Sequence, residues 1–103
     1  MMEIYWHDGL LQSLRLDASG RVQIECDLYL NEESSRRVRF LFDCSGVSSF
    51  VATIDCNAII ESARAGNINS GRFEQRPRKA RIKLFLNDGY VDLTASAIRC
   101  EQA

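Results

Sequence analysis

The residues best suited to chemistry are His7-Asp8, a pair that contains the only histidine of the 103-residue chain. A histidine that a carboxylate orients can act as a general base or as a metal ligand. Neighbouring side chains of an extended segment point in opposite directions, however, so Asp8 need not orient His7. A turn at Asp8-Gly9, with His7 bonded to the backbone, explains the pair without any reaction. We therefore predict no catalytic residues, and an enzyme centred on His7 is kept as an alternative.

The cysteines do not have the spacing of a metal site. No C-x-x-C pair, the usual core of a structural zinc site, occurs among Cys26, Cys44, Cys56 and Cys100. Cys26 and Cys56 fall on apolar faces and are predicted to be core residues, whereas Cys44 and Cys100 are predicted to be more exposed. The first residues, MMEIYWHDG, lack the features of a signal peptide. We therefore expect a cytoplasmic location, free thiols, and neither metal nor cofactor.

Basic side chains form a second candidate site. Residues 72–83 hold six basic groups and one acid, and a smaller basic group lies at 36–39. Together they could bind phosphate groups. This candidate anion-binding patch consists of Arg36, Arg37, Arg39, Arg76, Arg78, Lys79, Arg81 and Lys83. The sequence pI of about 5.8 lies well below that of dedicated nucleic-acid domains. A nucleic-acid partner is therefore not favoured, and nucleic-acid or phosphate binding is an alternative function.

Charge is divided unevenly along the chain. Residues 1–35 carry seven acids and two arginines, whereas residues 36–103 carry eleven basic side chains and seven acids. Such asymmetry can mark a charged binding face. The simpler interpretation is that the acidic first third folds against the basic remainder, so that the charges neutralise one another locally.

A period of two is the strongest secondary-structure signal. From Arg21 to Leu30 apolar side chains alternate with polar ones, which is typical of a strand with one buried and one solvated face. The same alternation predicts strands near residues 10–17, 38–43, 50–54, 81–86 and 91–97. Cys44-Ser45-Gly46 is predicted to be a loop, and further strands are allowed near Ile4-Trp6 and Phe73.

The turn of the first hairpin follows from keeping its buried faces matched. Pairing Leu16 with Val22 leaves Ala18-Ser19-Gly20 as the loop. Three-residue loops of this kind need a residue with positive φ near their end, which Gly20 supplies. The side chain of Asp17 is placed to bond the backbone of the turn.

The last hairpin is predicted to turn at Asp88-Gly89, a preferred dipeptide of two-residue hairpin loops. This turn pairs Leu86 with Val91 and keeps the following apolar pairs on one face, whereas a three-residue loop would mix the two faces.

One short helix is predicted after Asp55. Cys56, Ile59, Ile60 and Ala63 recur at helical spacing, and the helix would pack its apolar stripe on the sheet. The predicted fold is therefore α+β in a single domain, 1–103. It is mainly an antiparallel meander of about six to eight strands curled around that helix, and closure into a barrel is left open.

Several apolar side chains fall on the solvated faces of the predicted strands. They are Tyr29, Leu41, Val51, Phe85, Tyr90 and Ile98. Gathered on one surface, they would form a patch for a protein partner or a homodimer, with the first five as its main residues. The longest apolar runs are too short to cross a membrane. The leading hypothesis is a non-enzymatic, cytosolic protein-binding module.

The stretch YWHDGLLQSL at residues 5–14 resembles the openings of small uncharacterised bacterial domains. These domains begin with a His-Asp pair followed by an apolar strand, and some look like immunity proteins of polymorphic toxin systems. The resemblance implies a binding role rather than catalysis.

Overall fold

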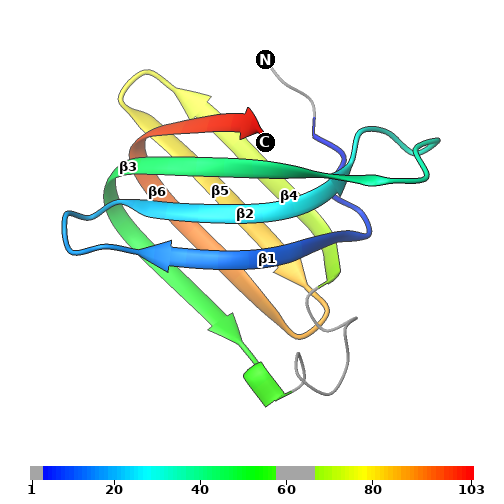
Figure 1. The fold of residues 1–103 in the computed structure, drawn as a ribbon. Coiled ribbons are helices and arrows are strands. Elements are labelled where there is room, and N and C mark those ends of the chain that lie inside the picture. The colour runs from blue at the N-terminus through cyan, green and yellow to red at the C-terminus, as the bar shows by residue number, and fades with distance from the viewer. Residues whose placement is uncertain (1–3, 58–66) are drawn as a thin grey trace.

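The computed structural model describes residues 4–57 and 67–103, which form one antiparallel sheet that closes into a barrel (Figure 1). Neighbouring strands follow the order β1-β2-β3-β6-β5-β4. The strands are β1 (Gly9–Leu16), β2 (Val22–Tyr29), β3 (Arg37–Ile54), β4 (Asn67–Arg76), β5 (Lys79–Leu86) and β6 (Gly89–Gln102). No helix in this part of the chain is long and apolar enough to cross a lipid bilayer.

The α+β prediction is wrong, because the described residues form an almost purely β fold. Within them only Cys56 and Asn57 are helical, and Cys56 is exposed rather than packed on the sheet. The rest of the predicted helix, at 58–66, lies outside the described residues. No helix is needed to cover the inner face, because β3 and β6 are long enough to belong to both walls and the sheet covers itself.

β3 continues through the predicted loop at Cys44-Ser45-Gly46. Gly46 has a φ of 61°, and the pairing with β6 shifts between Val47 and Ser49, which together bend the strand. Cys44 is buried instead of exposed because the strand continues through it, in the same inward phase as Phe40 and Phe42. Beyond the corner the alternation changes phase in both strands, so that Ile98 lies inside the barrel instead of on its solvated face.

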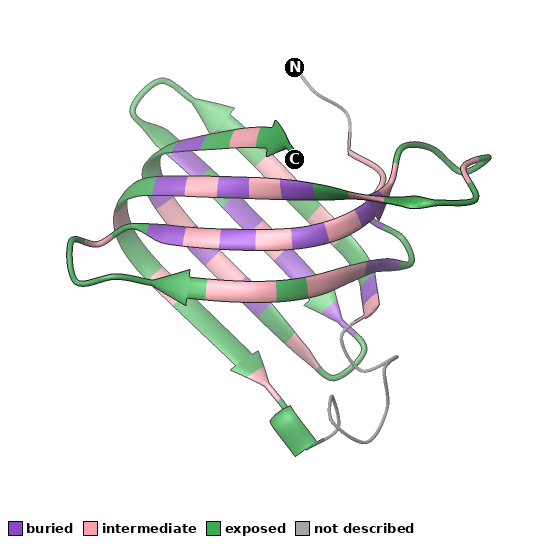
Figure 2. Ribbon diagram, in the orientation of Figure 1, coloured by how far each residue is buried: buried purple, intermediate pink, exposed green. Residues whose placement is uncertain are grey.

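The predicted alternation is confirmed most clearly in β2, where every second side chain from Val22 to Leu28 is fully buried (Figure 2). Aromatic rings fill one part of the interior. Phe42 stacks on Trp6 with ring centroids 5.6 Å apart and meets Phe73 edge-on at 5.7 Å. The predicted strand at Ile4-Trp6 is not formed, but Trp6 belongs to the core.

The first predicted turn is confirmed and the last is wrong. Leu16 pairs with Val22, and Gly20 has a φ of 82°. In the last hairpin Leu86 pairs with Gly89 rather than Val91, so the turn residues are Asn87-Asp88. The slip of two residues keeps the same side chains inside. Gly89 is required for another reason, since a Cβ there would collide with the carbonyl oxygen of Thr53 on β3.

The barrel closes through a short seam between β1 and β4. Gly9 pairs with Ile68 and Leu10 with Asn67. The seam is extended by the segment before β1, in which the amide of Asp8 donates to the carbonyl of Ile68 at 3.0 Å. The N-terminal segment therefore lies beside β4 and completes one end of the barrel.

Candidate functional site: an apolar hollow at the barrel mouth

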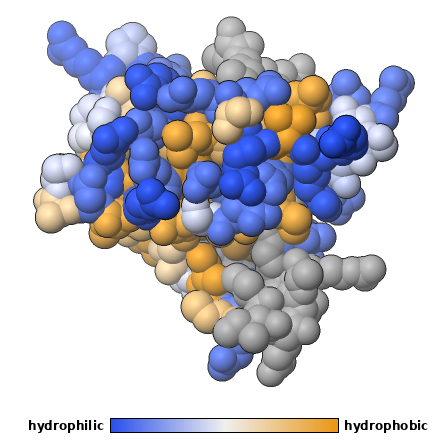
Figure 3. Space-filling model, in the orientation of Figure 1, coloured by the Kyte–Doolittle hydropathy of each residue, from blue (hydrophilic) through white to orange (hydrophobic). Residues whose placement is uncertain are grey.

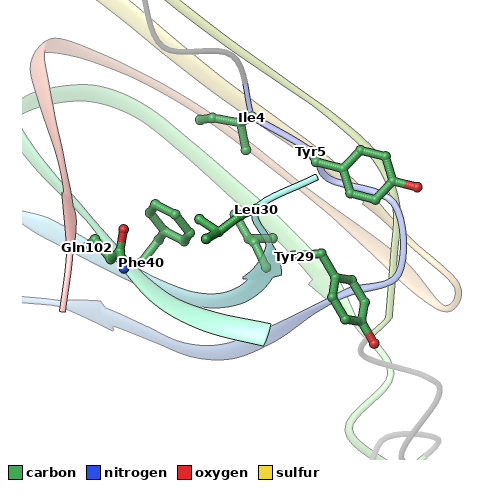
Figure 4. A pocket seen from close by; sticks show the side chains of 7 residues that line it. Ile4, Tyr5, Tyr29, Leu30, Phe40 and Gln102 are labelled. Carbon is green, nitrogen blue, oxygen red and sulfur yellow. The ribbon is translucent and has the colours of Figure 1, made fainter. Parts of the chain in front are cut away.

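The hollow lies at the end of the barrel where β2 stops and β3 starts, beside the N-terminal segment (Figure 4). Its volume is about 220 Å³. The lining residues are Ile4, Tyr5, Leu28, Tyr29, Leu30, Phe40 and Gln102. They come from four parts of the chain that only the closed barrel brings together.

Leu30 contributes exposed apolar surface to the rim of the hollow. It follows the last residue of β2, and 54% of it is exposed, whereas Phe40 on the adjoining strand is 9% exposed. In Figure 4 the side chains of Ile4, Leu30 and Phe40 point toward one another, and the hydroxyl groups of both tyrosines point away. The mouth therefore presents apolar atoms around a small concave space.

A second hollow of about 250 Å³ adjoins the first and shares Ile4, Tyr5 and Leu30 with it. It adds Asn31 and Glu32, and Glu32 is the one charged side chain among the residues that line the two hollows. Each volume is below the roughly 300–1,000 Å³ of pockets that enclose drug-sized ligands. The mouth has room for protruding side chains rather than for a whole cofactor.

The five predicted partner-binding residues do not form one patch. Phe85 and Tyr90 are paired across β5 and β6, and Val51 on β3 is paired with the residue two positions after Tyr90. Tyr29 lies elsewhere, under the guanidinium of Arg37 at 4.8 Å. Leu41, the fifth, stands between two acids on its neighbouring strands. Only the outer trio, which we define as Val51, Phe85 and Tyr90, is contiguous.

The outer trio is small for an interface between two copies of the chain. Its members are 46%, 45% and 38% exposed. Together they expose on the order of 250 Å² of apolar surface, since a whole aromatic side chain offers about 150–250 Å². A stable dimer buries about 800 Å² on each partner. The outer trio alone therefore suits a smaller ligand better than a second copy.

Three arginines of the candidate anion-binding patch are already bound to other groups. Arg39 contacts Asp27 and Glu25, and Arg81 donates two hydrogen bonds to Asp92 at 3.1 and 2.9 Å. Arg37 donates to the carbonyl oxygen of Asp8 at 2.9 Å. The hydrogen bond from Arg81 also holds the pKa of Asp92 below its ordinary value.

The remaining basic residues separate into two groups. Arg36 precedes β3, whereas Arg76, Arg78, Lys79 and Lys83 lie on the β4–β5 hairpin. The start of β3 and the turn of that hairpin lie on opposite sides of the barrel (Figure 1). The predicted single anion-binding patch is therefore not formed. The concentrated positive charge lies on the β4–β5 hairpin alone.

The wall made by β1, β2 and β3 is neutralised by ion pairs, as the uneven charge of the sequence suggests. Asp43 on β3 accepts two hydrogen bonds from Arg21, at 2.8 and 2.6 Å, and a third contact from Arg99 at 3.4 Å. The hydrogen bonds from Arg21 lower the pKa of Asp43. Figure 3 shows hydrophilic side chains over much of this wall.

His7 and Asp8 occupy an exposed turn before β1. The amide of Gly9 donates to the carbonyl of Trp6 at 3.0 Å, and Asp8 has a φ of 62°, so the turn is present but lies one residue earlier than predicted, at His7-Asp8. His7 Nδ1 lies 3.3 Å from the carbonyl oxygen of Asn69, and Nε2 lies 3.5 Å from Asp8 Oδ2. Among the described residues no three His, Cys, Asp or Glu side chains gather as metal ligands do.

The described cysteines are all free thiols. Burial raises the pKa of Cys26 to about 12 and that of Cys44 to about 12, so both thiols stay protonated and unreactive at neutral pH. Burial also raises the pKa of the half-buried Cys100. The prediction of an exposed Cys44 is wrong because β3 runs through it, and the prediction of a core Cys56 is wrong because Cys56 lies beyond the end of β3 and is exposed.

Comparisons with known proteins place the fold and nothing further. No family model matches the chain, and no curated protein matches it. A crystal structure of an uncharacterized protein from Neisseria gonorrhoeae is similar to it, with a TM-score of 0.61 and 12% sequence identity. The similarity covers 96% of this chain and 95% of that chain. The two proteins share a fold.

Proposed function

We propose that the chain is a non-enzymatic binding module for another protein, and that its mouth hollow receives an apolar side chain of that partner. The observation that carries the proposal is Leu30, a 54% exposed leucine on the rim of a concave apolar surface. Interface hot spots are typically apolar or aromatic anchors seated in such recesses. Burial of the rim would gain about 25 cal/mol for each Å² of apolar surface removed from water.

The lining residues also define the chemistry of the partner. Glu32 lines the hollow that adjoins the recess, so a lysine or arginine beside the apolar anchor would complement it. The mouth hollow has a small volume, about 220 Å³, which favours one or two side chains over a small-molecule substrate. We therefore expect the partner to present an exposed segment with an apolar anchor and a neighbouring basic residue.

Peptide selection tests this proposal. A phage-displayed library of random 12-residue peptides is selected on the full chain, and the enriched peptides are measured by anisotropy. We expect enrichment of an apolar residue next to lysine or arginine. Leu30→Asp should weaken binding at least tenfold, because it places a carboxylate in the recess.

The matched control is Leu16→Asp. Leu16 is 61% exposed and does not line either hollow, so the same substitution there should leave the affinity unchanged. Failure to enrich any peptide, or equal losses in the two variants, would show that the mouth is not the binding surface.

The finer form of the proposal is that the partner is a toxin, which is the class that the resemblance at residues 5–14 implies. Cells that express a toxin encoded beside this chain should grow when the chain is co-expressed. Rescue by Leu16→Asp but not by Leu30→Asp is the expected pattern. Equal rescue by both variants would show that protection does not depend on the mouth hollow.

A further inference from the structure

The outer face of the β4–β5 hairpin places like charges directly opposite one another. Arg72 is paired with Lys83, and Arg76 is paired with Lys79. Directly opposed like charges destabilise a pair of strands. Glu74 is the one acid of the hairpin, and it lies 3.6 Å from Arg72. Glu74 faces Arg81 and Asp92 faces Lys83 across neighbouring strands, but the Arg72–Lys83 and Arg76–Lys79 pairs themselves are repulsive. An anionic ligand would relieve this repulsion.

The cations of β5 stand in a line that leads to exposed aromatic rings. Its outward residues are Lys79, Arg81, Lys83 and Phe85, because the intervening residues are buried. Side chains two positions apart on one strand face are about 6.6–6.8 Å apart, so this line is about 20 Å long. The ammonium of Lys83 lies 5.1 Å from the ring of Phe85, and Tyr90 is paired with Phe85.

The acidic overall composition does not cancel this local charge. The carboxylates of Glu25 and Asp27 are on β2, where Arg39 contacts them. In the closed order of strands β2 and β5 are three places apart and lie on opposite walls. The barrel is at least 20 Å across, whereas salt screens charges beyond about 8–10 Å. Among the described residues near the hairpin, Glu74 and Asp92 are the acids that weaken its positive field.

We infer that this face binds single-stranded nucleic acid. The phosphates would lie along the four opposed cations, Arg72, Arg76, Lys79 and Lys83, and unpaired bases would stack on Phe85 and Tyr90. Proteins that bind single strands combine a track of positive charge with exposed aromatic rings in this way. A duplex would leave the rings unused, because its bases are stacked on one another. The site is separate from the mouth hollow and does not depend on the function proposed above.

Fluorescence anisotropy of the full chain tests the inference. The probes are a labelled 12-nucleotide oligothymidine and a labelled 12-base-pair duplex, each at 50 and 200 mM NaCl. Neutralising three or four phosphates predicts that affinity for the single strand falls roughly 20- to 50-fold between these two salt concentrations. The single strand should bind more tightly than the duplex at both.

Two kinds of variant separate the charges from the rings. Arg76→Gln with Lys79→Gln should lower the affinity for oligothymidine at least tenfold at 50 mM salt and flatten its salt dependence. Phe85→Ser should lower the affinity about tenfold at either salt concentration, because it removes a stacking surface. Circular dichroism confirms that each variant is folded.

The matched control is Arg15→Gln with Arg36→Gln, which removes two exposed arginines away from the hairpin and changes the net charge equally. It should keep its affinity, as should Leu30→Asp at the mouth. The inference is overturned by absence of binding at 50 mM salt, or by equal losses in the control. It is also overturned by tight duplex binding that Phe85→Ser does not affect, which would mean attraction between charges alone.

Discussion

Trp6 shows how much of this barrel depends on a residue outside the strands. It precedes β1, yet it is 9% exposed and stacks on Phe42 in the core. The ring fits because Gly71 on β4 has no side chain. A Cβ at Gly71 would lie 2.5 Å from Trp6 Cδ2. The close approach of the indole to the β4 backbone joins the N-terminal segment to the barrel.

We expect Gly71→Ala to lower the free energy of unfolding by about 1–3 kcal/mol, since the new methyl group overpacks the core against the indole. Urea unfolding measures the change. In a Trp6→Leu background the same substitution should cost close to nothing, because the ring that it strikes is gone. An equal cost in both backgrounds would place the clash elsewhere.

At the scale of an element, the β4–β5 hairpin depends on the register of its two strands. Its turn is Pro77-Arg78, with Arg78 at a φ of 68°, and its outer face carries the opposed cations. The sequence alone predicts a strand near Phe73 that ends at Pro77, and β4 confirms it. It does not predict which cations oppose one another, because that depends on the register of the hairpin.

Lys79→Glu should stabilise the protein. The substitution replaces a repulsive pair with an attractive one, in which the new carboxylate faces Arg76 across the two strands, and about 0.2–1 kcal/mol is typical of such a pair. The expected rise in Tm is about 1–6 °C, measured by thermal unfolding at low salt. Lys79→Gln removes the repulsion only and should give a smaller rise. A fall in Tm for Lys79→Glu would mean that the opposed charges do not destabilise the hairpin.

Periodicity predicts the inner face of each straight strand but not the curvature of the sheet. The alternation in β2 and the turn at Gly20 follow from local pattern and are confirmed. The corner at Gly46 looks like a loop in the sequence, because a bend changes the phase of the pattern just as a loop does. A helix is then inferred to cover a sheet that in fact covers itself.

The mouth hollow was missed for a related reason. Its residues are far apart in the chain, and only closure of the barrel brings Ile4 to Leu30 and Phe40. The alternation places Leu30 on the buried face of the predicted strand 21–30, whereas β2 ends at Tyr29 and leaves Leu30 54% exposed. The prediction of one outer patch is wrong because residues that share an outward phase on their strands need not be neighbours on a curved surface.

At the scale of the whole molecule, ion pairs tie the strands together and make stability depend on pH. Asp43 joins β3 to Arg21 and to Arg99 on β6, and Asp92 joins β6 to Arg81 on β5. Hydrogen bonds from arginine lower the pKa of both carboxyl groups from 3.8. Their contribution is therefore complete above the ordinary aspartate pKa and is lost as the pH falls through the lower values of the folded state.

We expect the urea midpoint to be level between about pH 5 and 8 and to fall below about pH 4. Asp43→Asn should lower the midpoint at pH 7 and reduce the additional loss on acidification, because one of the titrating groups is absent. Unfolding curves at pH 7 and pH 3 measure both effects. Identical midpoints at the two pH values would exclude these pairs as contributors to stability.

The strand order also divides the barrel into two meanders of consecutive strands, β1–β2–β3 and β4–β5–β6. Within each meander the turns bring neighbouring strands together locally. Apart from the short seam, the halves are joined by one ladder, which runs from Phe40 paired with Gln102 to Ile54 paired with Gly89. Local pairings form before distant ones because less chain entropy is lost. We therefore expect the two halves of the barrel to form first and then to dock through the ladder between β3 and β6.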